Sequence, residues 1–235
     1  MPRDPIWRSI ANTVQSEIAG GLYRPGDKLP TEAELADRFG VNRHTVRQGL
    51  ASLTEAGILH SRRGSGVFVA ARPTDYPLGQ RVRFQQNVAA SGRTPSRRIT
   101  RLETRPVSTV EATALTLPTT ALVHVIEGIS LADDQPLAMF SSVFPADRLP
   151  GFLTAMAAQN SVTAALAACG LTDYTRAETR LTATLADGLQ ALALHVQTGA
   201  PILRSVALNV DTDGQPIEYG TTWFAGDRVT LTVSP

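Results

Sequence analysis

The hydrophobic positions near the start of the chain recur at helical spacing. Ile6, Ile10, Val14 and Ile18 are four residues apart and are followed by two glycines at 20–21. Such spacing places the four side chains on one stripe of a helix, and glycine commonly ends a helix. The pattern predicts an amphipathic first helix over residues 5–20, with one face buried.

Two shorter helices are predicted next, joined by a tight turn. Thr31 followed by Glu34 is a capping-box pattern, and Gly40 is a suitable C-terminal cap for the same helix. Asn42 is a good N-cap for the third helix, whose buried side includes Val46 and Leu50. Short strands at 58–61 and 67–69 then flank a tip of arginines and glycines at 62–66.

The first turns of the third helix carry polar side chains outside the apolar stripe. Arg43, His44, Thr45 and Arg47 are positioned to reach outward, as the recognition helix of a DNA-binding protein requires. A charged helix face can also simply be solvated, and His44 fits either a base contact or an exposed position without one. Thr31 and the neighbouring Glu32 suit helix caps better than base readers.

These elements occur in a specific order. Leu29-Pro30-x-Glu32, Val46-Arg47-x-x-Leu50 and Gly64-x-Gly66-x-Phe68-Val69 follow one another. In this combination, residues 6–70 resemble the winged helix-turn-helix of the GntR family of bacterial transcription regulators. The resemblance implies contacts to double-stranded DNA by Asn42, Arg43, His44, Thr45 and Arg47 and by the wing tip, Arg62, Arg63, Gly64 and Ser65.

The expected roles of these residues differ. Arginine binds guanine edges or phosphates, so Arg43 and Arg47 are expected to contact bases or the backbone. Asn42 and Thr45 are expected mostly to position the DNA backbone. The wing glycines permit close approach to the sugar-phosphate backbone or the minor groove, and its arginines supply positive charge.

A stretch with two prolines and a glycine at 73–79 marks a domain boundary. We therefore expect a DNA-binding domain at 1–71, a linker at 72–83 and a second domain at 84–235. The second domain mixes alternating and helical patterns, which predicts an α+β fold with an antiparallel sheet. The predicted strands are 96–107, 121–131, 137–144, 174–183, 202–210, 217–224 and 229–233, and the predicted helices are 109–114, 162–169 and 188–194.

Two segments in this region, 123–144 and 202–224, share one pattern: a predicted strand, an acidic turn that contains Gln-Pro, and a second predicted strand. They are either an internal repeat of hairpins whose cleft holds a ligand or two ordinary hairpins of one sheet.

The second half also resembles a known domain. Residues 80–235 resemble the UTRA ligand-binding domain of the HutC subfamily, a fold shared with chorismate lyase. A closer likeness, to the phosphonate-utilisation regulators of that subfamily, is carried by residues 41–48, 72–78, 83–87, 176–180 and 216–219. The resemblance implies a small, anionic effector and an effector site. The expected effector-binding residues are Arg83, Phe84, Arg176, Arg180, Glu218 and Tyr219.

One departure from that family pattern bears on the ligand. The positions that commonly carry arginine or glutamate in UTRA domains for sugar phosphates are here Gly128, Ser130, Phe140 and Ala225. Either the ligand is not a sugar phosphate, or Arg83, Arg176 and Arg180 hold the anion bidentately. Arg176 and Arg180 could instead lie on an exposed strand face paired with acids such as Glu178.

Charge is unevenly distributed along the chain. The net charge is +3 over residues 1–72, +5 over 73–105 and −7 over 106–235. Only the basic part suits a polyanion, which supports two domains with different partners. With 43% hydrophobic residues, one cysteine (Cys169) and no apolar run near the roughly 18 residues of a spanning helix, we expect a globular cytoplasmic protein with no membrane contact.

No catalytic or metal-binding pattern is evident. The four histidines lack metal-ligand spacing, Cys169 lies in an alanine-rich helix, and no motif joins a nucleophile to a base. We expect no cofactor, no metal and no enzymatic activity, with an enzyme on a chorismate-lyase-like fold as a remote alternative. The main expectation is a homodimeric repressor of a pseudo-palindromic operator, released by a small organophosphonate or phosphate-containing metabolite. The alternative is a regulator that responds to a non-phosphorylated ligand or to none.

Overall fold

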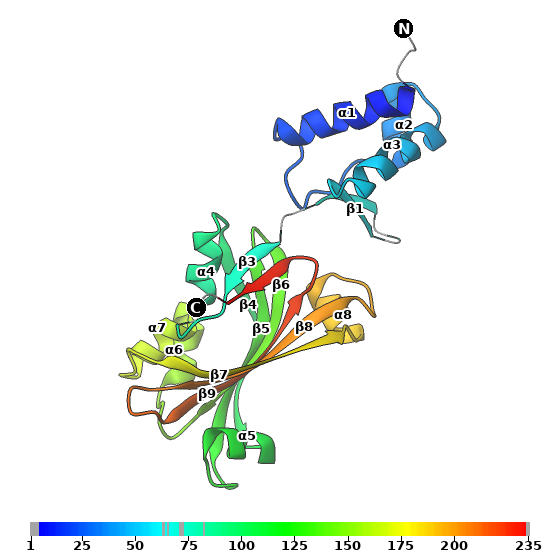
Figure 1. The fold of residues 1–235 in the computed structure, drawn as a ribbon. Helices are drawn as coiled ribbons and strands as arrows, with labels where there is room; N and C mark the ends of the chain where they lie inside the picture. The colour runs from blue at the N-terminus through cyan, green and yellow to red at the C-terminus, as the bar shows by residue number, and fades with distance from the viewer. Residues whose placement is uncertain (1–4, 63, 65, 71–72, 82, 234–235) are drawn as a thin grey trace. The chain divides into compact units, whose positions relative to one another are not determined.

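The computed structural model describes residues 5–62, 64, 66–70, 73–81 and 83–233. The chain divides into two compact units, residues 1–72 and 73–235 (Figure 1). Residues 74–77, inside the expected linker at 72–83, form a strand that belongs to the second unit. Each unit is described separately.

The first unit contains three helices and a two-stranded hairpin. Their bounds are α1 Ile6–Ala19, α2 Glu32–Phe39, α3 Arg43–Glu55, β1 Leu59–Arg62 and β2 Gly66–Val69. Ile10 and Val14 of the apolar stripe of α1 are buried against α3, with Val14 and Val46 fully enclosed, whereas Ile6 at the start of the stripe is exposed. The helices and strands predicted from hydrophobic periodicity are therefore present within one or two residues of their expected bounds.

The predicted helix caps are also present. Thr31 Oγ1 accepts a hydrogen bond from Glu34 N at 3.3 Å, while Glu34 Oε2 accepts one from Thr31 N at 2.7 Å. Gly40 ends α2 with φ of +64°, a left-handed conformation that favours glycine. These caps fix where α2 begins and ends. Asn42 caps the start of α3 directly after Gly40, so the polar first turn of α3 has a defined position.

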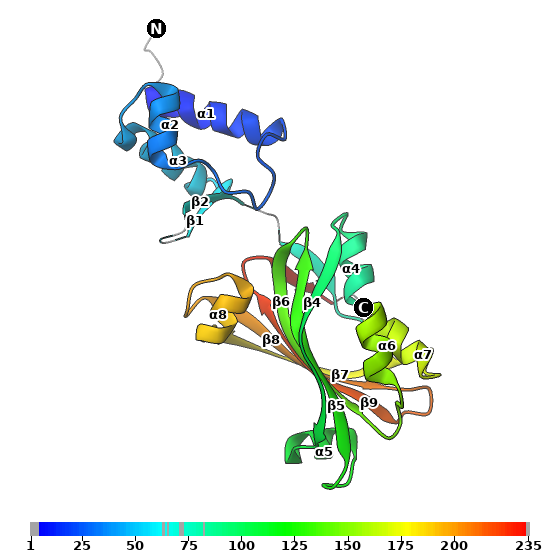
Figure 2. The same cartoon turned by 180° about the vertical axis from the view of Figure 1, so that it is seen from behind.

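The second unit is an antiparallel six-stranded sheet with the order β4-β5-β6-β9-β8-β7 (Figures 1 and 2). A separate parallel pair joins β3 to β10. The fold class is thus the predicted α+β arrangement. The strands are β3 Thr74–Pro77, β4 Pro95–Pro106, β5 Leu122–Ala132, β6 Gln135–Pro145, β7 Thr175–Leu185, β8 Pro201–Val210, β9 Pro216–Ala225 and β10 Val229–Thr232, and the helices are α4 Phe84–Ala90, α5 Thr109–Leu115, α6 Phe152–Gln159, α7 Val162–Ala168 and α8 Gly188–Leu194.

The sheet is built from two similar halves. Each half runs strand, short helix, strand, strand: β4-α5-β5-β6 and then β7-α8-β8-β9. The halves meet where β6 pairs with β9, α5 contacts β9, and α8 contacts β6. Both short helices open with a capping box and end at a left-handed residue, Thr116 or His195. The suspected hairpin repeat therefore extends to four elements in each half.

One face of the sheet is covered by α4, α6 and α7 (Figure 2). Phe144 packs against Phe152 with ring centroids 4.6 Å apart, and both side chains are completely buried. Helices α4 and α6 were not predicted from the sequence. Helix α4 buries only Phe84 and Val88, and α6 only Phe152 and Met156, too few apolar positions to stand out as a periodic pattern.

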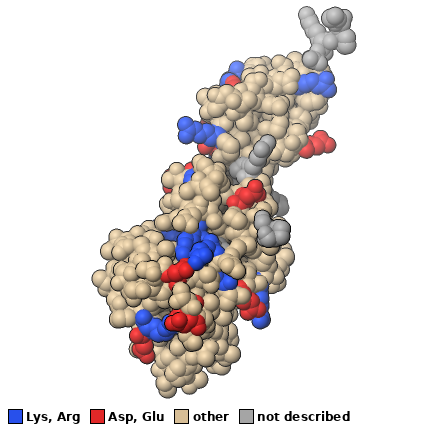
Figure 3. Space-filling view, turned by 60° about the vertical axis from the view of Figure 1, so that its left-hand side comes forward, with Lys and Arg blue, Asp and Glu red and all other residues tan. Residues whose placement is uncertain are grey.

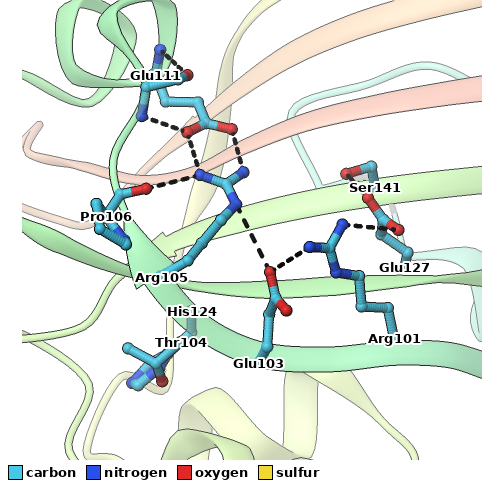
Figure 4. A network of polar contacts seen from close by, with 10 residues as sticks. Arg101, Glu103, Thr104, Arg105, Pro106, Glu111, His124, Glu127 and Ser141 are labelled. Carbon is cyan, nitrogen blue, oxygen red and sulfur yellow. Dashed lines mark hydrogen bonds and ion pairs between the residues drawn. The ribbon is translucent and has the colours of Figure 1, made fainter.

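A polar network ties α5 to the edge strand β4 (Figure 4). Arg105 donates to both oxygens of Glu111 at 2.7 and 2.8 Å, and Glu111 also accepts from the backbone N–H of Ser108 at 2.9 Å. These hydrogen bonds, led by that from Arg105, lower the pKa of Glu111 to about 2. Arg101 joins the network through Glu103 at 2.5 Å.

This network predicts a pH-dependent effect of Glu111→Gln. A carboxyl whose pKa falls on folding contributes stability above its unfolded pKa and loses it as the pH falls towards 2. The full shift corresponds to about 3 kcal/mol, which solvent screening reduces to about 1–2 kcal/mol. Urea unfolding should therefore show that the variant is less stable at pH 7 and nearly equal to the parent near pH 2. An equal deficit at both pH values would contradict the assignment.

Two strand glycines provide a matched test of packing. A Cβ on Gly128 would lie 2.5 Å from the carbonyl oxygen of Arg98 and about 3.0 Å from the Phe140 ring, whereas a Cβ on Gly220 would meet nothing nearer than 3.5 Å. Gly128→Ala should lower the free energy of unfolding by about 1–3 kcal/mol because backbone and ring must shift. Gly220→Ala should be close to neutral in the same thermal or urea denaturation. Equal effects would contradict the close contact at Gly128.

Candidate functional site

The first candidate surface is the start of α3. Asn42 Oδ1 accepts hydrogen bonds from Thr45 N at 2.8 Å and from Thr45 Oγ1 at 3.0 Å, so both residues take part in capping the helix. Arg43 and His44 are exposed on the same turn. The sequence-predicted residues are therefore brought together on one turn, and a cap holds that turn rigidly.

Arg47 has a partner within the protein. Its Nε and Nη2 donate to the two oxygens of Glu32 at distances from 2.6 to 3.1 Å. The hydrogen bond from Arg47 lowers the pKa of Glu32, and the same contact raises the pKa of Arg47. The carboxylate of the α2 capping box is Glu34 rather than Glu32, so Glu32 is the partner of Arg47 and not a cap.

The wing is partly described. Gly64 and Gly66 have φ of +76° and +115°, conformations that side chains rarely adopt. Arg62 ends strand β1, and Arg63 and Ser65 lie outside the described residues. Lys28, exposed in the connector before α2, reaches the wing: its Cε would lie 2.8 Å from a Cβ on Gly66. Sequence reasoning missed Lys28 because only the pairing of Lys28 with Phe68 brings it there.

The second candidate site is a cavity of about 330 Å³ in the second unit. It lies on the face of the sheet that α4 and α7 cover, and it crosses the pairing of β6 with β9. Phe140 and Ser142 contribute from β6, and Glu218 and Thr222 from β9. The charged lining residues among those described are Arg83, Arg97, Arg176 and Glu218, so positive charge is in excess.

Among the described residues, none of these three arginines forms an ion pair with a carboxylate, and two of them, Arg83 and Arg97, have a buried nitrogen with no hydrogen-bond partner. Arg97 lies with its guanidinium carbon 5.4 and 5.0 Å from the ring centroids of Phe84 and Phe140, and Arg83 lies 4.4 Å from that of Tyr174. Arg97 Nε and Arg83 Nη1 are buried without a hydrogen-bond partner. Desolvation by burial lowers the pKa of Arg97, and burial raises the pKa of Tyr76 on the same wall to about 12.

Several other arginines of this unit are paired with acids. Arg81 lies 2.6 Å from Asp173, and Arg93 lies 2.8 Å from Asp133. On the face seen in Figure 3, basic and acidic side chains of this unit accordingly form adjacent blue and red groups. Unpaired guanidinium nitrogens inside the cavity are therefore a distinct feature of the site.

A single carboxylate, Glu218, also lines the described part of the cavity. Ser142 Oγ donates to Glu218 Oε1, and Asn209 Nδ2 donates to Glu218 Oε2, both at 2.7 Å. Arg176 Nε in turn donates to Asn209 Oδ1 at 2.7 Å. The cavity thus combines guanidinium groups that can bind an anion with one carboxylate held in a fixed orientation.

Four of the six predicted effector residues line the cavity, namely Arg83, Phe84, Arg176 and Glu218. Arg180 and Tyr219 do not. A β-bulge between Arg176 and Glu178 reverses the alternation of side chains, so Arg180 no longer shares a face with Arg176. Arg180 instead pairs with Glu178 at 2.7 Å.

Tyr219 follows Glu218 directly along β9 and therefore lies on the other face of the sheet. There it packs against the cluster of Leu115, Val123, Val125 and Val143.

Arg97 was missed because it stands in an arginine-rich stretch that gives no sign of which side chain is buried. Of the four positions that depart from the UTRA pattern, Ser130 and Phe140 line the cavity, and the Phe140 ring packs over Gly128.

Other kinds of site are not supported by the described part of the chain. Its His, Cys, Asp and Glu side chains form no group of three suited to a metal ion. Burial raises the pKa of the Cys169 thiol, which disfavours the reactive thiolate. Within the described ranges, no helix combines the length and apolar character needed to span a membrane.

Each unit of the chain matches a known protein family. The model of the bacterial regulatory proteins of the gntR family matches residues 7–69, and the UTRA domain model matches residues 90–230. An uncharacterised HTH-type transcriptional regulator of Rhizobium meliloti, RB1450, is 35% identical over 97% of this chain and 94% of its own length. The HTH-type transcriptional repressor NagR of Bacillus subtilis is 29% identical over 97% and 93%.

A solved structure extends the similarity to the fold. The crystal structure of PhnF from Mycobacterium smegmatis superimposes with a TM-score of 0.67 at 26% identity, covering 96% of this chain and 98% of that one. These relatives are transcription regulators rather than enzymes. The chain belongs to the GntR family of bacterial transcription regulators, with an N-terminal winged helix-turn-helix and a C-terminal UTRA domain.

Proposed function

We propose that this regulator is a repressor that leaves its operator when a small anionic metabolite, a phosphonate or phosphate ester, occupies the UTRA cavity. The observation that carries the proposal is the charge of the cavity: three arginines line it with one carboxylate, and two of the guanidinium groups have a buried nitrogen with no hydrogen-bond partner. Guanidinium groups bind phosphate-like oxygens bidentately, and they are costly to bury without a partner.

The similarity to named regulators supports the finer parts of the proposal. The repressor role is supported by the name of NagR. The phosphonate class is supported by the sequence resemblance to phosphonate-utilisation regulators, and PhnF from Mycobacterium smegmatis is among the similar structures. An alternative is a non-phosphorylated ligand, and the apolar Phe140 and small Ser130 in the cavity favour it.

On the DNA side, the proposed contacts come from α3 and the wing. Arg43 and Arg47 would contact bases or phosphates, Asn42, His44 and Thr45 would support them, and Lys28 would reach a phosphate beside the wing. A homodimer would place two such surfaces on a pseudo-palindromic operator, because two-fold protein symmetry matches two-fold DNA symmetry. Effector and operator would then oppose each other by linkage.

The effector proposal is tested on the full chain with methylphosphonate, 2-aminoethylphosphonate and glycerol phosphate. At least one anion should raise the melting temperature, because a ligand at 100 times its Kd adds about 2.7 kcal/mol of stability. The same anion should lower the affinity for operator DNA measured by fluorescence anisotropy. Ethanolamine and glycerol, which lack the anionic group, are the matched controls. Stabilisation by ethanolamine or glycerol, with none by the three anions, would reject an anionic effector.

The DNA contacts are tested by Arg43→Ala and Arg47→Ala. Each substitution should weaken operator binding by about 1–3 kcal/mol if the side chain binds a base bidentately, and should also reduce the salt dependence if it binds a phosphate. Gln48→Ala, at an exposed position of the same helix, is the control and should leave affinity unchanged. Unchanged affinity in both arginine variants would remove α3 from the interface.

A further inference from the structure

We propose that Arg97 is the residue that anchors the anionic head of the effector, with Arg83 as the second donor and Glu218 as the acceptor for a hydroxyl or amino group on the same molecule. This inference rests on the proposed anionic effector and adds the residue and the ligand class. The ligand would be a compact oxyanion with a hydroxyl or amino group at its other end.

Arg97 is built into the cavity wall. It lies on β4 directly opposite Ser130 of β5, and both residues line the cavity. Its Nε is buried and has no hydrogen-bond partner, and no carboxylate lies within ion-pair distance in the described part of the chain. A buried charge without a partner is expensive. The natural completion of this arrangement is an anion that enters the cavity.

The surroundings of Arg97 are aromatic and supply no strong acceptor for its buried Nε–H. Phe84 of α4 and Phe140 of β6 both lie within cation–π distance of its guanidinium. Aromatic rings stabilise the positive charge, but they do not accept strong in-plane hydrogen bonds from the guanidinium edge. The rings therefore hold the side chain in place while its donor edge remains available for oxygen atoms.

Gly128 explains why Phe140 can occupy this position. The two residues are direct partners across β5 and β6, and ring atoms of Phe140 lie 3.0 and 3.1 Å from where a Cβ on Gly128 would be. A larger residue at 128 would displace the ring from Arg97. Gly128 and Phe140 together thus form the support on which the Arg97 guanidinium rests.

The polar end of the ligand is assigned from Glu218. Each carboxylate oxygen accepts one hydrogen bond, from Ser142 or Asn209, which fixes its orientation. A carboxylate offers about four acceptor positions, so capacity remains for a ligand donor. Neither Ser142 nor Asn209 neutralises the charge, so Glu218 favours a hydroxyl or ammonium group and disfavours a second anion.

Calorimetric titration of the full chain with 2-aminoethylphosphonate and inorganic phosphate tests the assignment. Arg97→Gln should weaken binding about tenfold or more, the loss expected for a charge-assisted hydrogen-bonding pair. Arg97→Lys, which keeps the charge without the planar fork, should restore part of it. The control is Arg98→Gln, because Arg98 is the next residue on β4 but is exposed and outside the cavity lining. Its affinity should equal that of the parent.

A second measurement separates anchoring from a structural role. If the function of Arg97 is to bind the ligand, the Arg97→Met variant should melt, without ligand, at the same temperature as the parent or higher. Its melting temperature should no longer rise when 2-aminoethylphosphonate is added. A lower melting temperature with unchanged binding would make Arg97 a packing residue and overturn the inference. Anion binding by the parent with equal binding by Arg97→Gln would overturn only the role of Arg97, whereas no anion binding by the parent would overturn the proposed function as well.

Discussion

The pairing of β6 with β9 is the interaction on which the UTRA unit depends. It joins two halves with the same order of four elements, and the short helix of each half packs on the last strand of the other, α5 on β9 and α8 on β6. A three-stranded half alone would leave this last strand with an unpaired edge and without its helix. The cavity crosses this seam, with Phe140 and Ser142 on one strand and Glu218 on its partner. The contact that completes the sheet therefore also assembles the site.

In the second unit, the net charge of the sequence differs in sign from the charge of the residues that line the cavity. The UTRA half of the sequence is acidic overall, yet its cavity is lined by three arginines and one carboxylate. Several surface arginines of this unit are matched by acids such as Asp173 and Asp133, whereas Arg97 and Arg83 are not. Net charge consequently predicts which unit suits a polyanion such as DNA, but the ligand of a buried site depends on the few charges that face it.

Features that depend on neighbouring residues were predicted correctly from the sequence. The face of the sheet on which a side chain lies depends on strand register, and it was not predicted correctly. Thr31 and Asn42 act through neighbouring residues, so their caps were predicted directly. Arg176 and Arg180 were both expected at the effector site, but a β-bulge between Arg176 and Glu178 puts Arg180 on the other face of the sheet. Arg97 and Arg98 are adjacent arginines, and only the pairing of β4 with β5 decides which of them faces the cavity. One extra residue in a strand is enough to reverse such an assignment.

The ion pair between Arg47 and Glu32 bears on how the first unit would bind DNA. The side-chain exposure is 65% for Arg47 and 30% for Glu32. A pair so open to solvent contributes less than about 1 kcal/mol, so exchanging Glu32 for a phosphate or a base costs little. In the proposed contact with DNA, the carboxylate would orient the guanidinium beforehand and so limit the conformational freedom that Arg47 loses on binding. Exposed arginines of α3 can thus be preorganised by an acid of α2, whereas buried Arg97 is positioned by aromatic rings and has no acid to exchange.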